Sequence, residues 1–103
     1  MYEMQKRVHE MIQKYDLESS AEIRMIDLMS EVGELGKEVL KGDDYGRNEF
    51  SITTNTESEL GDVLFSLMCI ADGMNISLKT ALENVLQKYE NRFQNNGNIG
   101  SGN

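Results

Sequence analysis

The feature that most constrains the fold is a helical hydrophobic period that runs along most of the chain and is not interrupted by proline. Apolar residues recur at intervals of three and four, which places them on one face of an α-helix. We predict helices over about residues 2–15, 20–41, 56–72 and 77–94, with a loop at 43–55. Four helices in this order predict an all-α, antiparallel four-helix bundle.

The length of 103 residues fits a single domain. We assign residues 1–94 to this domain and residues 95–103, which are rich in Gly and Asn, to a C-terminal tail. The single cysteine excludes an internal disulfide. Because we find neither a membrane-length apolar run nor a signal peptide, we expect a cytoplasmic protein without a membrane partner.

Short motifs predict where the helices begin and end. Ser19 with Glu22, and Thr56 with Glu59, have the spacing of a capping box, in which two side chains satisfy free backbone N–H groups. Gly42 stands where a glycine commonly follows a helix.

The third predicted helix is apolar on nearly all sides, which indicates burial on several faces. Its apolar residues are Leu60, Val63, Leu64, Phe65, Leu67, Met68, Ile70 and Ala71. One chain of this size does not cover such a helix, so we predict a dimer or a dimer of dimers.

Negative charge is concentrated in the middle of the chain. The net charge is −8, and residues 27–62 hold ten acidic and three basic side chains. Nucleic-acid polymers are poor partners for such a segment because their binding depends on Lys and Arg. Divalent cations, in contrast, would be attracted to it.

Two pairs of carboxylates lie within this acidic segment: Glu31 with Glu34, and Glu59 with Asp62. A spacing of three places each pair on one helix face, beside an apolar stripe. Ligands that are oxygen atoms only, without His, suit Mg²⁺ or Mn²⁺. The alternative is a solvated acidic face, with Glu59 serving as a capping residue.

Gly33 and Gly61 each lie inside one of these carboxylate pairs. A glycine in the middle of a helix costs about 1 kcal/mol relative to alanine. We interpret both as positions where another backbone approaches closely, which strengthens the case for a site.

A family resemblance extends over about residues 20–93, through LMSEVGELGKEV, ESELGDVLFSLMCIADGMNIS and ALENVLQKYENRF. These stretches resemble the MazG-like nucleotide pyrophosphohydrolases of the all-α NTP pyrophosphatase superfamily. The resemblance implies that four carboxylates serve as metal ligands and catalytic groups, and that two cations hold the β and γ phosphates. The carboxylates are Glu31, Glu34, Glu59 and Asp62, and the cations are Lys88 and Arg92.

The implied reaction is hydrolysis of a (deoxy)nucleoside triphosphate between its α and β phosphates, which gives the monophosphate and pyrophosphate. The implied cofactor is Mg²⁺, with Mn²⁺ as an alternative, and the implied assembly is a homodimer or homotetramer. The family further suggests removal of non-standard or excess nucleotides from the cellular pool.

This chain departs from the family pattern at two positions. Ser30 replaces the leading glutamate, so any role of that acid as a base is absent. Leu86 replaces an Asn that often precedes the Lys, and Asn84 is a candidate substitute. Two alternatives therefore stay open: a nucleotide sensor that binds without turnover, and a non-catalytic helical interaction module.

Several other residues receive simpler interpretations. We expect Glu38 and His9 to be ordinary surface residues and Cys69 to be a small buried hydrophobe. Three loop residues, together with the GSG segment of the tail, are predicted to close over a bound nucleotide. These loop residues are Tyr45, Arg47 and Phe50.

Overall fold

The structure is a computed structural model that describes residues 2–96, and these residues form four helices and no strand. The helices are α1 (Tyr2–Lys14), α2 (Ala21–Gly42), α3 (Thr56–Gly73) and α4 (Leu78–Asn96). The predicted all-α class is confirmed, and each predicted helix boundary agrees with the structure within two residues. Most of the proposed tail, residues 97–103, lies outside the described part.

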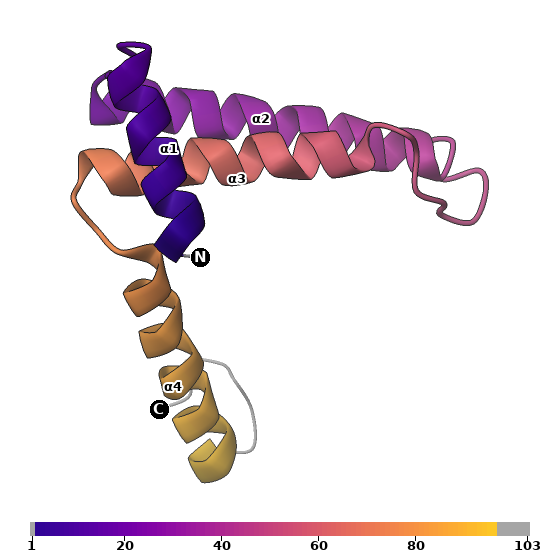
Figure 1. The fold of residues 1–103 in the computed structure, drawn as a ribbon. Helices are drawn as coiled ribbons and strands as arrows, with labels where there is room; N and C mark the ends of the chain where they lie inside the picture. The colour runs from indigo at the N-terminus through magenta and orange to yellow at the C-terminus, as the bar shows by residue number, and fades with distance from the viewer. Residues whose placement is uncertain (1, 97–103) are drawn as a thin grey trace.

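The helices form a right-angled rather than a compact arrangement (Figure 1). α2 and α3 run antiparallel as a long hairpin, α1 crosses this hairpin near one end, and α4 leaves the same end at a bend of 103° from α3. Within the chain, α4 packs on α1 instead of along the hairpin. The radius of gyration is 17.0 Å, whereas a compact domain of 100 residues has about 13 Å.

The small core lies where α1 crosses α3. Among the described residues, the buried apolar side chains are Ile12, Met68, Cys69 and Ala71. Burial raises the pKa of the Cys69 thiol, which keeps it protonated at neutral pH. This agrees with the prediction that Cys69 acts as a small hydrophobe.

Both capping-box predictions are wrong in detail. The N-cap of α2 is Ser20 and not Ser19, so the helix begins one residue later than the motif implies. The Oγ of Ser20 accepts from the backbone N–H of Ile23 at 3.2 Å. At α3 the N-cap is Asn55, whose side chain makes no capping bond. Thr56 is instead the first helical residue, and its Oγ1 accepts from the N–H of Thr53 at 3.1 Å.

Gly42 is explained by close approach and not by a left-handed backbone. It is the last residue of α2, and a Cβ at this position would lie 2.5 Å from Cε1 of Phe50 and 2.6 Å from the carbonyl oxygen of Ser51. The loop folds back against the end of α2 at this point, and only glycine leaves room for it.

The interpretation of Glu38 as a surface residue is wrong. Its side chain is buried, with a residue exposure of 6%. It accepts a hydrogen bond from the Oγ1 of Thr53, and that hydroxyl also lies 3.0 Å from the Oγ1 of Thr56. The folded-back loop covers Glu38, so this carboxylate joins α2 to the start of α3.

Among residues 2–96, we find no single helix with both the length and the apolarity needed to cross a membrane. α3 and α4 reach the required length and hydropathy only when they are taken together, and the chain bends by 103° between them.

Candidate functional site

Three of the four predicted carboxylates lie together on the α2–α3 hairpin. One carboxylate oxygen from each of Glu31, Glu59 and Asp62 falls within 4.8 Å of the others. Glu31 and Glu59 are half-buried and Asp62 is exposed. The antiparallel pairing of α2 with α3 brings them together, because it sets the middle of α2 opposite the first turns of α3.

The electrostatics of this group are unfavourable without a counter-ion. The pKa of Glu59 is raised, first by partial burial and then by repulsion from the carboxylates of Asp62, Glu34, Glu31 and Glu38. Each of these causes penalises the ionised form of Glu59. A bound cation would offset the same repulsion.

The chemistry and the spacing of the group fit a magnesium ion. Mg²⁺ binds oxygen ligands at about 2.0–2.1 Å, so opposite ligands lie roughly 4 Å apart. The 4.8 Å limit between the three carboxylate oxygens needs only small side-chain movements to meet this spacing. Glu31, Glu59 and Asp62 are therefore the residues that would hold the ion.

Glu34 lies near this group but outside its three oxygens. Its side chain is exposed on α2, and its charge contributes to the raised pKa of Glu59. Gly33 and Gly61 do not behave as predicted within one chain, because a Cβ at either position would meet nothing within 4 Å. Within residues 2–96, no neighbouring segment comes close to either glycine.

Lys88 and Arg92 lie on α4, far from the carboxylates of their own chain. They line a shallow cavity of about 430 Å³ on α4, together with Asn84. Both side chains lie near the ring of Tyr89, with Lys88 Nζ at 5.5 Å and Arg92 Cζ at 5.9 Å from its centroid.

The distance between the two groups follows from the helix geometry. Asp62 lies eleven residues before the end of α3 and Lys88 ten residues after the start of α4. At 1.5 Å per residue, and with a bend of 103°, their backbones are on the order of 20 Å apart. One chain alone therefore does not bring the cations to the carboxylates.

The loop residues predicted to close over a nucleotide lie at the far end of the hairpin. The side chain of Arg47 is 3.7 Å from the carboxylate of Asp44, Phe50 lies against Gly42, and Tyr45 is exposed. Their closing over a nucleotide stays a prediction.

His9 is exposed as predicted, and it has a contact that the sequence did not indicate. Its Nδ1 lies 2.6 Å from Oδ1 of Asp72, near the end of α3. No local sequence motif predicts this contact, because the two residues are 63 positions apart in the chain. They meet because α1 crosses α3.

Together, the four helices and the oxygen-only carboxylate group define an all-α domain with a candidate site for a divalent metal ion. The family model for the MazG nucleotide pyrophosphohydrolase domain matches residues 19–96. The chain belongs to the MazG nucleotide pyrophosphohydrolase family.

Solved structures and a curated relative agree with this assignment. The crystal structure of the Bacillus-conserved MazG protein, a nucleotide pyrophosphohydrolase, is similar at 38% identity and a TM-score of 0.72, over 84% of this chain and 85% of that one. YpjD from Bacillus subtilis is similar at 33% identity and a TM-score of 0.72, over 84% and 91%. The curated sequence of the uncharacterised protein YpjD from Bacillus subtilis strain 168 is 39% identical to this chain over 71 residues. The match spans 62% of that relative's length.

Proposed function

We propose that this protein hydrolyses (deoxy)nucleoside triphosphates at the α–β bond in a Mg²⁺-dependent reaction, with Mn²⁺ as an alternative ion. The observation that carries the proposal is the convergence of Glu31, Glu59 and Asp62 from two helices. Family membership supports it, since the family is named for this class of reaction. Removal of unwanted nucleotides from a cytoplasmic pool is the corresponding cellular role.

In this proposal the carboxylates hold the metal and position the reacting water. A bound Mg²⁺ would neutralise phosphate charge and activate the water. Glu31, Glu59 and Asp62 supply the ligands. Glu34, the exposed neighbour of the group, would bind a second water or ion or accept the proton. Ser30 offers no carboxylate, so the proton goes to one of the remaining acids.

The phosphate-binding cations come from a second copy of the chain. In one chain the backbones of Lys88 and Asp62 are on the order of 20 Å apart, and α4 stands away from the hairpin (Figure 1). Large apolar side chains also remain exposed on α3, including Leu60 at 53% and Leu64 at 43%. A homodimer or homotetramer would cover this surface and place one copy's α4 near another copy's carboxylates.

The test is pyrophosphate release from a panel of ribo- and deoxyribonucleoside triphosphates, with Mg²⁺ and with EDTA. We expect metal-dependent pyrophosphate with an equal amount of monophosphate. Orthophosphate with diphosphate would show that a different bond is cleaved. A folded protein that turns over no nucleotide would contradict the proposal.

One observation favours a second candidate, a nucleotide sensor: Ser30 stands where the family pattern has an acid. A sensor would bind a triphosphate with Mg²⁺ and leave it intact. Calorimetric titration with a nucleotide, followed by analysis of the recovered nucleotide, distinguishes the two functions. A helical interaction module would bind neither the nucleotide nor the metal.

A further inference from the structure

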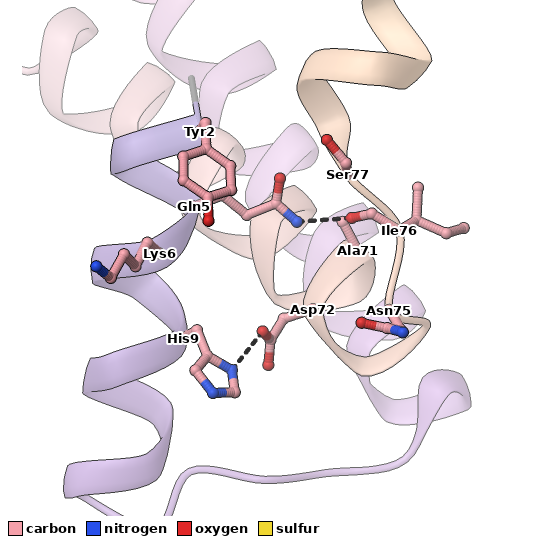
Figure 2. Close-up of a pocket in the computed structure, with 9 residues that line it drawn as sticks. All are labelled: Tyr2, Gln5, Lys6, His9, Ala71, Asp72, Asn75, Ile76 and Ser77. Carbon is pink, nitrogen blue, oxygen red and sulfur yellow. Dashed lines mark hydrogen bonds and ion pairs between the residues drawn. The ribbon is translucent and has the colours of Figure 1, made fainter.

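The joint between α3 and α4 is held by a side chain from α1. The amide Nε2 of Gln5 donates to the carbonyl oxygen of Ile76 at 2.7 Å, and its Oε1 accepts from the N–H of Leu78 at 2.9 Å (Figure 2 shows the first of these bonds). Both partners are backbone groups, one in the connection and the other in the first residue of α4. One carboxamide therefore joins three parts of the molecule.

These two bonds satisfy groups that the helices leave free. The N–H of Leu78 belongs to the first turn of α4, where backbone donors have no partner inside the helix. The Oγ of Ser77 accepts from the N–H of Thr80 at 3.3 Å, so Gln5 and Ser77 cap the same turn from two sides. The N–H of Ile76 bonds to the carbonyl of Ala71 at 2.9 Å, which anchors the connection to α3 as well.

Packing leaves part of the joint open. A cavity of about 390 Å³ lies between α1 and the α3–α4 connection, and Gln5, His9, Asp72 and Ile76 are among its lining residues (Figure 2). One turn after Gln5 on α1, His9 contacts Asp72 at 2.6 Å. Polar contacts from one face of α1 therefore bridge a joint that contains an open cavity.

We infer that Gln5 is a positioning residue, whose carboxamide fixes the direction of α4 and thereby places Lys88 and Arg92 for the triphosphate. This inference rests on the proposed function for its effect on substrate, and on the hydrogen bonds alone for its effect on α4. Its role is positioning rather than catalytic because both of its amide hydrogen bonds go to backbone groups at the joint.

The test compares Gln5→Ala with Gln13→Ala. Gln13 is a matched control because it lies on the same helix and donates from its own amide to Glu18 at 2.9 Å, away from the joint. For Gln5→Ala we expect faster hydrogen exchange at the amide of Leu78 and a KM for the triphosphate that rises about fivefold, with kcat within about twofold. The gain in melting temperature with Mg²⁺ should not change.

Gln13→Ala should change neither the exchange at Leu78 nor the KM. Gln5→Glu keeps an acceptor for Leu78 but loses the donor to Ile76, so its KM should fall between those of the wild type and Gln5→Ala. If Gln5→Ala fails to fold, the KM of Gln5→Glu decides the inference, because this variant loses the bond to Ile76.

Two results would overturn the inference: unchanged exchange at Leu78 in Gln5→Ala, or faster exchange with an unchanged KM. An inactive wild-type protein would contradict the proposed function and the effect on substrate together. In that case the exchange at Leu78 still decides whether Gln5 holds α4.

Discussion

Glu59 is the residue on which the repulsion within the carboxylate group acts most clearly. Its folded-state pKa is raised above the ordinary value of 4.5. A carboxyl whose pKa is higher in the folded than in the unfolded state lowers the free energy of unfolding at pH values above its folded-state pKa. This penalty decreases as the pH falls and disappears below 4.5. Glu59→Gln should therefore raise the melting temperature of the metal-free protein at pH 7 and abolish the gain produced by Mg²⁺.

Melting curves with EDTA and with Mg²⁺, from pH 7 down to pH 4, measure both effects. The advantage of Glu59→Gln over the wild type should shrink as the pH falls. Glu57→Gln, an exposed acid two residues earlier in the same helix, is the control and should keep the response to Mg²⁺. A wild-type melting temperature that ignores Mg²⁺ would contradict the metal site.

Glu38 is a buried carboxylate whose partner lies in the loop. Glu38→Ala removes the acceptor for Thr53 and should cost about 1–3 kcal/mol of stability, whereas Glu38→Gln keeps an acceptor and should cost less. Urea denaturation measures the difference, and limited proteolysis should cut the 43–55 loop faster in the alanine variant. Equal cutting of both variants and the wild type would show that Glu38 does not hold the loop.

At the scale of single elements, two glycines of α2 are predicted to respond to alanine in opposite ways. Gly42→Ala places a Cβ against Phe50 and the backbone of Ser51, so we expect a loss of about 1–3 kcal/mol. Gly36→Ala meets nothing within 4 Å in mid-helix, so we expect a gain of up to about 1 kcal/mol. Denaturation curves of the two variants test this contrast, and a stable Gly42→Ala would contradict the observed approach of the loop.

The elements themselves could be predicted well because a helix is a local structure. The apolar period located all four helices, since it depends only on neighbours three and four residues apart. The caps were predicted less well, because the same Ser and Thr side chains can serve alternative partners. Thr56 bonds to Thr53 in the preceding loop, and this choice depends on how the loop folds against Glu38.

At the scale of the whole molecule, the exposed apolar surface predicts an assembly. Leu64 is 43% exposed in one chain, so in a monomer Leu64→Asp should cost about 1 kcal/mol, from the covered part of the side chain. In a dimer or tetramer it should weaken the assembly and lower the melting temperature. Sedimentation at micromolar concentration measures this, with Ser58→Asp on the same helix as the control. A wild-type protein that sediments as a monomer would contradict the assembly.

A mixing experiment tests whether two copies share one site. Glu59→Gln chains lack a carboxylate, and chains with both Lys88→Ala and Arg92→Ala lack the phosphate-binding cations. If one copy's α4 serves another copy's carboxylates, unfolding and refolding the two inactive variants together should restore part of the activity. No recovery, from variants shown to assemble together, would place the carboxylates and cations of each site in one chain.

The sequence by itself determined the helices, the acidic centre and the family, because these depend on residue type and on short spacing along the chain. Only the tertiary structure decided which groups meet. The antiparallel α2–α3 hairpin brought Glu31 to Glu59 and Asp62. The folded-back loop buried Glu38. The crossing of α1 brought His9 to Asp72 and Gln5 to the start of α4. The 103° bend kept Lys88 and Arg92 away from their own carboxylates. The physical reason is that contacts between residues distant in sequence depend on helix crossing and loop path, which no local pattern encodes.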